Sequence, residues 1–123
     1  MDENTTPDIE IDFLGGNCPV QAEGRINGQR FYFRSRGQSW TLGIGGELIE
    51  TPAWEHAEWY GEWPEAGWIT TEQAEAFIRQ AAERYARGEA GGRLEDDPDR
   101  LAKARKQWRA QAGLIDEEGN KNV

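Results

Sequence analysis

The sequence predicts an α+β fold in which an antiparallel β-meander of three to four strands packs against one amphipathic helix, with a second helix after it. Three observations predict this fold. Short runs before residue 46 alternate apolar and polar residues, an Asn-Gly pair joins two of them, and apolar residues after residue 70 follow a helical period. Apolar residues that recur every 2 residues and, further along the chain, every 3.6 residues are typical of strands followed by helices.

The chain has 123 residues, of which 37% are hydrophobic and 30% are charged. This composition is typical of a globular domain rather than of a disordered chain. The N-terminal residues are acidic with no apolar stretch after them, and no apolar run reaches the length of a membrane span. Cys18 is the only cysteine, so no disulfide can form within the chain. We therefore expect a cytoplasmic protein without a membrane partner.

The charge divides the chain into two parts. We expect an α+β core domain at residues 1–90, followed by a linker and a basic helix at residues 91–123. Of the 23 acidic residues, 14 lie in residues 1–75, whereas only 4 of the 14 basic residues do. An acidic body repels nucleic acid and favours basic partners, although a net charge of −9 also serves solubility alone.

The first strand is expected at residues 8–14. Ile9, Ile11 and Phe13 alternate with three acidic residues, which is typical of a half-buried strand. We expect the three apolar side chains to face the core.

The clearest local signal is a hairpin formed by residues 20–26 and 29–35. Asn27-Gly28 tolerates the positive φ angles of a two-residue turn, and this loop length fixes the register of the strands. The face expected to be buried consists of Val20, Ala22, Ile26, Phe31 and Phe33. A further strand is expected at residues 39–45.

The apolar residues within 47–68 recur at neither strand nor helix spacing. They combine aromatic side chains with six glutamates and contain no basic residue. We expect a long loop here, with a helical turn near residues 53–60 as an option. Loops of this length are uncommon in compact domains and are often functional.

A helix is expected at residues 71–87. Thr70 and Gln73 match a capping box, and Gly88 closes the helix. Its apolar face recurs at helical spacing and consists of Ala74, Phe77, Ile78, Ala81, Ala82 and Tyr85. Its outer side carries two expected ion pairs, Glu75–Arg79 and Glu83–Arg87.

A second helix is expected at residues 98–112, followed by a frayed tail. Asp97 suits the N-cap position and Pro98 the first helical position. The apolar stripe is thin, and bases dominate the remaining positions: Arg100, Lys103, Arg105, Lys106 and Arg109. Such a helix either binds a nucleic-acid backbone or an acidic partner, or docks on the acidic body.

The acidic, Trp-rich segment supplies the first candidate site. Exposed aromatic residues among glutamates are suited to binding a partner protein. The candidate partner-binding residues are Trp54, Glu55, Glu58, Trp59, Tyr60, Glu62 and Trp63. The alternative is that these aromatic residues fold over the sheet and supply core.

One face of the hairpin supplies a second candidate site, for anions. Its residues are Arg25, Arg30, Tyr32, Arg34 and Arg36. The register places Arg25 opposite Arg30, which is unfavourable unless a counter-charge is present. The functional interpretation is a nucleic-acid surface with Tyr32 as a stacking ring, and the structural one is neutralisation by acids of the first strand and Glu23.

Catalytic chemistry has little support in the sequence. His56 is the only histidine, and we interpret it as a loop histidine paired with a neighbouring glutamate, Glu55 or Glu58. Cys18 lacks a neighbouring base and is expected to be buried or half-buried. We expect no catalytic residues, no metal site and no cofactor.

Residues 17–24 (NCPVQAEG), residues 31–37 (FYFRSRG) with Trp40, and Gly67-Trp68 resemble small uncharacterised phage and prophage proteins of proteobacteria. The resemblance extends over residues 15–87 and implies a phage accessory protein, without an activity. Such proteins often act by binding host proteins, including as anti-CRISPR inhibitors or DNA mimics. The basic second helix departs from a pure DNA mimic.

Three functions remain open from the sequence. The first is a non-catalytic module that binds a host protein through the Trp-rich segment, and the resemblance adds the option of a phage-encoded inhibitor. The second is a nucleic-acid-associated protein that uses the arginine face and the basic helix. The third is a small enzyme that uses His56 with a glutamate.

Overall fold

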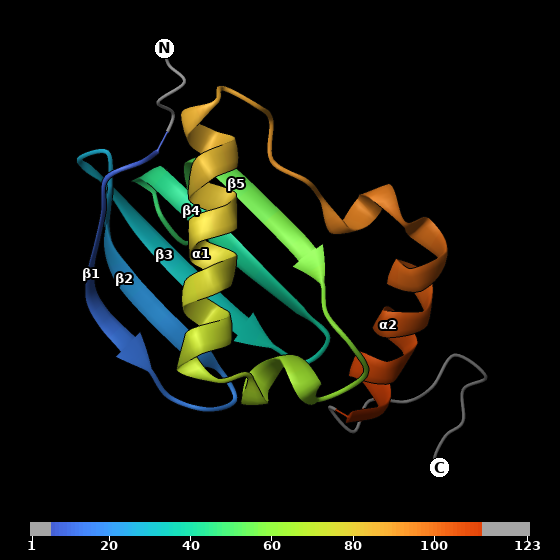
Figure 1. The fold of residues 1–123 in the computed structure, drawn as a ribbon. Helices are drawn as coiled ribbons and strands as arrows, with labels where there is room; N and C mark the ends of the chain where they lie inside the picture. Colours follow the sequence, from blue (N-terminus) through green and yellow to red (C-terminus); the bar gives the residue numbers. More distant parts are fainter. Residues whose placement is uncertain (1–5, 112–123) are drawn as a thin grey trace. The chain divides into compact units, whose positions relative to one another are not determined.

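The computed structural model describes residues 6–111. The chain forms two compact units, and the boundary between them in the sequence lies between Arg93 and Leu94. The first unit holds an antiparallel sheet in which each strand lies beside its neighbour in sequence (Figure 1). The strands are β1 (Ile9–Gly15), β2 (Val20–Ile26), β3 (Gln29–Arg36), β4 (Ser39–Glu47) and β5 (Thr51–Trp59). The predicted α+β class is confirmed, although the sheet has five strands instead of three to four.

The fifth strand lies within residues 47–68, so the expected loop, with its helical turn near residues 53–60, is wrong for this part. β5 pairs with β4 in a hairpin, with Trp54 opposite Ile44. An alternation of apolar and polar residues cannot be recognised in β5 from the sequence. Two of its inward positions carry a histidine and a glutamate, and only the third carries an apolar side chain, a tryptophan. Pro52 does not exclude a strand, because β5 is an edge strand and the missing N–H is tolerated there.

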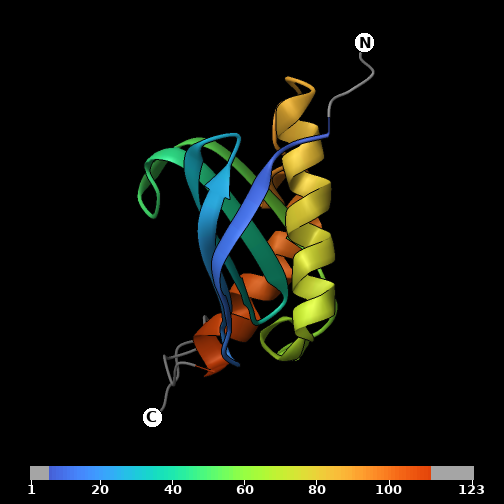
Figure 2. The same ribbon diagram turned by 60° about the vertical axis from the view of Figure 1, so that its left-hand side comes forward.

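The helix α1 (Thr71–Ala86) lies across one face of the sheet (Figure 2). The capping box is confirmed, since Thr70 Oγ1 accepts a hydrogen bond from the N–H of Gln73 and the Gln73 side chain accepts one from Thr70. The predicted buried face of the helix is also confirmed. The fully buried positions are Ala74, Ile78, Ala81 and Ala82. Because the alanine side chains are small, the helix can approach the sheet closely.

Trp40 is the largest side chain in the core, with 1% of its surface exposed. Its ring stacks on Phe77 of α1 at 5.0 Å between centroids, and Phe33 packs against it at 5.7 Å. The core residues predicted from the hairpin are all buried, and so are Trp40, Leu42 and Ile44 of β4. Burial of aromatic rings supplies much of the stability of a small core.

The direction predicted for Phe13 is wrong. The pairing of β1 with β2 shifts between Ile11 and Phe13, which is a β-bulge. The bulge reverses the alternation, so that Leu14 packs against the core and Phe13 is 53% exposed.

Cys18 is exposed, so the expectation that it is buried or half-buried is wrong. It lies in the connection between β1 and β2, outside the alternating strands, at a positive φ of 47°. Its backbone N–H donates a hydrogen bond to the carbonyl of Gly67 at 2.6 Å, so the backbone rather than the thiol makes the structural contact.

One of the two ion pairs expected on α1 is found. Glu75 and Arg79 lie 3.1 Å apart, as predicted. Arg87 instead pairs with Glu89 at 2.8 Å, because the helix ends before Arg87 and the chain turns back at Gly88.

The second unit contains a short 3-10 turn, η2 (Leu94–Asp96), and the helix α2 (Pro98–Gln111). The N-cap is confirmed, since Asp97 Oδ1 accepts a hydrogen bond from the N–H of Arg100 at 3.1 Å. The predicted end of this helix at residue 112 and the expected frayed tail lie outside the described residues. No helix of the described part is long and apolar enough to cross a membrane.

Candidate functional site

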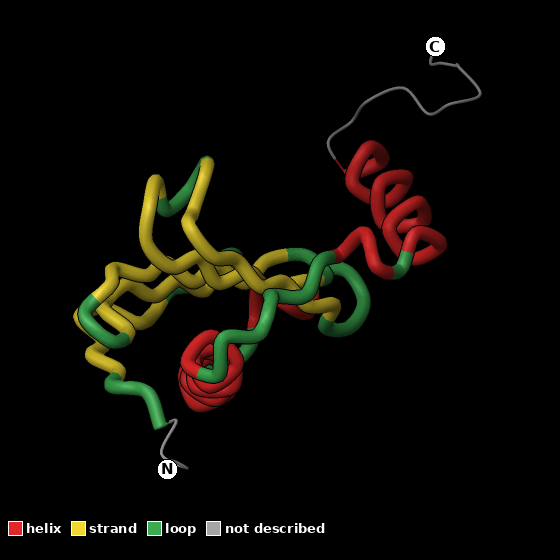
Figure 3. The backbone as a smooth tube through the Cα atoms, turned by 90° about the horizontal axis from the view of Figure 1, so that it is seen from above, coloured by secondary structure: helices red, strands yellow, loops and turns green. Residues whose placement is uncertain are grey.

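The face of the sheet that points away from α1, here called the outer face, carries the charged side chains of β2 and β3. The hairpin tip at residues 48–50 projects from this side, opposite α1 (Figure 3). The strand register aligns Arg25 with Arg30, and Tyr32 with Gly43 and Glu55. The residues that we use below as the outer face are Gln21, Glu23, Arg25, Arg30, Tyr32, Arg34, Arg36, Thr41, Gly43 and Glu55.

The central strand β3 places four of these side chains in one column. Arg30, Tyr32, Arg34 and Arg36 are separated by two residues each, so neighbouring side chains on the same face are about 7 Å apart. All three arginines are exposed and Tyr32 is half-buried. The column therefore presents cationic groups on either side of one aromatic ring.

Only part of this charge is compensated. Arg25 pairs with Glu10 of β1 at 3.3 Å, so the predicted neutralisation by the first strand is found at this residue. Arg30, Arg34 and Arg36 make no ion pair with any carboxylate within residues 6–111. The positive charge of the β3 column is therefore not neutralised by an ion pair within the described residues.

The orientation of Tyr32 is set by a neighbour on β2. Its hydroxyl donates a hydrogen bond to Gln21 Oε1 at 2.6 Å, which directs the ring from β3 across β2. Because the hydroxyl is occupied, the π-face of the ring is the part of Tyr32 that remains to contact a ligand.

A hollow of about 170 Å³ lies between the outer face and the hairpin tip. Gly45 and Gly46, with φ angles of +72° and +66°, bend the hairpin in a conformation that favours glycine. Gly43 forms part of the lining, and a Cβ there would lie 3.0 Å from the Leu48 carbonyl oxygen, so the tip approaches the sheet closely. The lining residues are Tyr32, Arg34, Thr41, Gly43, Leu48, Ile49 and Glu55.

The hollow contains residues that the sequence did not identify as functional. Leu48 and Ile49 were missed because residues 47–68 were interpreted as a loop. Thr41 and Gly43 lie on the strand expected at residues 39–45, and neither carries a charged or aromatic side chain that would mark it as functional. An apolar Leu48-Ile49 pair between two glycines and the next alternating run is the signal that could have indicated a hairpin tip. Ile49 is 75% exposed at the tip of this hairpin.

The Trp-rich candidate residues are distributed over different surroundings. Trp54 packs edge-on against Tyr85 of α1 and donates from Nε1 to the carbonyl of Glu89 at 2.9 Å. Tyr60 packs against Phe77, and its hydroxyl accepts a hydrogen bond from the Gln73 side chain. Two of the aromatic residues are therefore engaged with the helix.

The remaining members of that candidate set also point in several directions. Glu55 belongs to the outer face, whereas Glu58 belongs to the inner side of β5. Trp63 lies over Gly37, where an added Cβ would be 2.8 Å from the indole ring. Glu62 is exposed, and Trp59 and Trp63 are half-buried. The structure therefore does not gather the seven residues on one surface.

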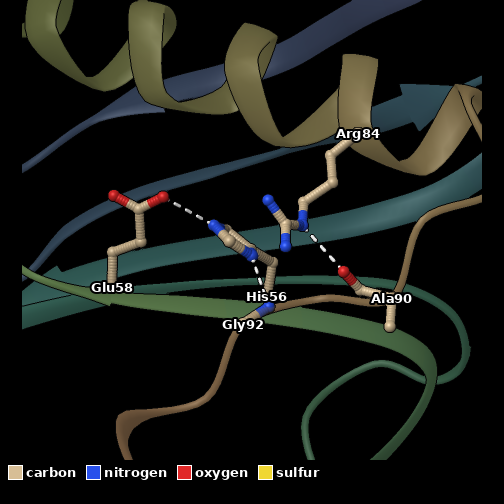
Figure 4. Close-up of polar contacts among 5 residues, drawn as sticks. All are labelled: His56, Glu58, Arg84, Ala90 and Gly92. Carbon is tan, nitrogen blue, oxygen red and sulfur yellow. Dashed lines mark hydrogen bonds and ion pairs between the residues drawn. The ribbon is translucent and has the colours of Figure 1, made fainter. Parts of the chain in front are cut away.

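His56 is buried on β5, with 4% of its surface exposed, instead of lying in a loop. Its Nε2 lies 2.7 Å from a carboxylate oxygen of Glu58, so the expected pairing with a glutamate is found (Figure 4). Its Nδ1 accepts a hydrogen bond from the backbone N–H of Gly92 at 2.7 Å. An N–H group can only donate, so Nδ1 is unprotonated and the proton of the neutral ring is on Nε2.

This arrangement is structural rather than catalytic in character. The lone pair on Nδ1 is occupied by Gly92, and the proton on Nε2 is directed at Glu58. A general base needs a free lone pair within reach of a substrate proton. Within residues 6–111 no group of three or more side chains could hold a metal ion.

Residues 89–92, here called the edge segment, run beside β5. The carbonyl of Gly92 accepts a hydrogen bond from the N–H of Ala57 at 3.0 Å, and the carbonyl of Ala90 accepts one from Arg84 of α1 (Figure 4). The edge segment thereby connects α1 to β5 through hydrogen bonds. From the sequence, we had expected residues 89–92 to belong to a linker without such contacts.

The fold and its outer face define a small α+β protein with an open, arginine-rich sheet surface. No protein-family model, no curated protein and no solved structure matches the chain.

Proposed function

We propose that the chain is a non-catalytic binding protein that holds single-stranded nucleic acid on its outer face. The observation that carries this proposal is the β3 column, in which three arginines without a carboxylate partner in the described chain flank Tyr32. Proteins that bind single strands combine cationic groups along the backbone with aromatic rings on which bases stack.

The spacing of the column supports a single strand as the ligand. Successive side chains on one face of β3 are about 7 Å apart, which is close to the distance between phosphates in an extended strand. The sheet also presents Tyr32 to an unpaired base, whereas the faces of bases within a duplex are stacked on each other and cannot stack on a side chain.

The net charge of −9 acts against this ligand at long range. At physiological salt the Debye length is about 8 Å, so acidic residues far from the outer face are largely screened. Contacts between guanidinium groups and phosphates form at hydrogen-bond distance and are retained. The expected affinity is therefore moderate and strongly dependent on salt.

The test is fluorescence anisotropy with a labelled oligouridine of about twelve nucleotides. We expect binding at low salt, with a slope of log K against log salt of about −2 for three phosphate contacts. Arg36→Gln should weaken binding and reduce the slope by about 0.7. Arg79→Gln on α1 is the matched control, because it removes the same charge from an exposed helix position.

The proposal would be overturned by an unchanged anisotropy at low salt. An equal loss in Arg36→Gln and Arg79→Gln would also overturn it, because the binding would then follow net charge and not the outer face. Circular dichroism of each variant checks that the fold is retained.

A protein partner bound through the Trp-rich segment is the second candidate. The observation in its favour is that Trp68 at the end of η1 (Glu65–Trp68) is 60% exposed, close in sequence to the exposed Glu62 and Glu65. Under this candidate function, the partner would be a host protein, and the chain would inhibit it, as the resemblance to phage proteins implies. Trp68→Ala should abolish capture of such a partner, and unchanged capture would remove the candidate.

An enzyme that uses His56 is the least supported of the three. Its two nitrogens are engaged by Gly92 and Glu58, and the ring is buried. We therefore place the function of the chain in binding.

A further inference from the structure

We propose that the hollow beneath the hairpin tip is a slot for a single guanine base of the bound strand. This inference rests on the proposed function, because it assigns one base-recognition site within the same outer face. It is carried by three features of the hollow: its size, the flat surfaces around it, and a cation and an anion that do not neutralise each other.

The size of the hollow restricts the ligand. Its volume is about 170 Å³, smaller than the roughly 300 Å³ at which pockets for drug-sized ligands begin. A single ring system fits such a space, whereas a peptide helix or an oligosaccharide does not. The hollow is also open on one side, so a base can enter while its sugar and phosphate stay on the sheet surface.

The surfaces of the hollow suit a flat ring. Gly43 contributes no side chain, and the Leu48 carbonyl oxygen would lie 3.0 Å from a Cβ there, so the hairpin tip closes over this part of the sheet and forms a wall of the hollow. Tyr32 contributes an aromatic ring to the lining, and Leu48 and Ile49 of the hairpin tip contribute apolar groups. Proteins hold an unstacked base by contacts with aromatic rings and with apolar side chains.

The polar groups of the hollow are complementary to guanine in particular. Arg34 and Glu55 line it together, yet neither forms an ion pair with any residue of the described chain. By strand spacing their Cα atoms are roughly 12 Å apart on a diagonal across β4, which leaves room for a ligand between the two side chains. A ligand with two donors on one edge and two acceptors on another satisfies both.

Guanine has this pattern. Its N1–H and N2 amino group are adjacent donors for the Glu55 carboxylate, and O6 and N7 are adjacent acceptors for the Arg34 guanidinium. Adenine, cytosine and uracil each place an acceptor beside their donor on the Watson–Crick edge, so a carboxylate meets a lone pair there. A site that hydrogen-bonds one ligand rejects analogues that leave its polar groups unpaired.

The experiment compares oligouridines of about twelve nucleotides that carry one central guanosine, adenosine, cytidine or uridine. We expect the guanosine oligonucleotide to bind about tenfold more tightly than the other three. Central inosine, which lacks the N2 amino group, and central 7-deazaguanosine, which lacks N7, should each lose part of this preference.

Two variants assign the preference to the hollow. Glu55→Gln should remove the preference for guanosine, so that this variant binds the guanosine oligonucleotide and plain oligouridine with affinities within about twofold of each other. Glu23→Gln is the matched control, because it removes the same charge from an exposed position of β2 that does not line the hollow, and it should leave the preference intact.

Equal affinity for all four central bases would overturn the guanine slot and leave the proposed function standing. A guanosine preference that survives Glu55→Gln would also overturn it, because recognition would then occur elsewhere. The absence of binding to every oligonucleotide would overturn both the proposed function and the slot.

Discussion

Gly92 donates a hydrogen bond from its backbone N–H to Nδ1 of His56 at 2.7 Å, although the two residues are 36 positions apart. The same imidazole contacts Glu58 through Nε2. One buried ring therefore connects the edge segment, the last strand and a surface carboxylate. This contact gives the first prediction.

His56→Ala should lower the free energy of unfolding by about 2–4 kcal/mol. The substitution leaves a cavity beneath α1 and removes the partner of the Gly92 N–H. Urea denaturation measures the change, and Glu62→Gln, an exposed substitution further along the chain, should alter stability by less than about 0.5 kcal/mol. If His56→Ala is as stable as the control, the ring does not hold the edge segment.

Gly91→Ala should be more disruptive than its small size suggests. A Cβ at this position would lie 1.7 Å from the carbonyl oxygen of Glu55, so the edge segment must move away from β5. Gly28→Ala is the control, because its Cβ would meet nothing within 4 Å and only its φ of +81° opposes the change. We expect hydrogen exchange at Ala57 to accelerate in Gly91→Ala alone, and equal exchange in both variants would contradict the contact.

The tryptophans should differ widely in their effect on stability. Trp40→Ala removes a ring that is 1% exposed and stacked on Phe77, so we expect a loss of about 3–5 kcal/mol or complete unfolding. Trp68→Ala removes a ring that is 60% exposed, and the expected change is within about 0.5 kcal/mol. Thermal denaturation separates the two, and similar losses would show that Trp68 belongs to the core.

The pair formed by Arg87 and Glu89 gives a prediction for pH. The hydrogen bond from Arg87 holds the pKa of Glu89 below its ordinary value of 4.5. A carboxyl group whose pKa is lowered by folding contributes stability above its unfolded pKa and loses that contribution as the pH falls through the folded pKa. NMR titration of Arg87→Gln should show the Glu89 pKa rising toward 4.5, and an unchanged pKa would contradict the pairing.

Local signals in the sequence were sufficient for much of the fold. Asn27-Gly28 set the register of β2 and β3, and the capping box at Thr70 set the start of α1. Both depend on residues within a few positions of each other, where backbone preferences and side-chain hydrogen bonds act directly. These predictions are confirmed for that reason.

Features that depend on contacts between distant residues were missed. The bulge that turns Phe13 outward arises from the pairing of β1 with β2, which the alternation of β1 alone does not reveal. The inward His56 is satisfied by Gly92, and nothing near His56 in the sequence indicates this partner. The candidate site shows the same limit: its arginines were found from one strand, whereas Glu55 and Ile49 joined them only through the hairpin.

The edge segment also bears on how the molecule behaves at high concentration. An unpaired strand edge is a template on which other chains assemble, and natural sheets block such edges. On the β5 side, Gly92 occupies part of the rim by bonding to Ala57. On the β1 side, the bulge at Phe13 and the acidic Glu10 and Asp12 oppose the docking of an identical strand. Both rims of the sheet are thus protected against pairing with a strand of an identical chain.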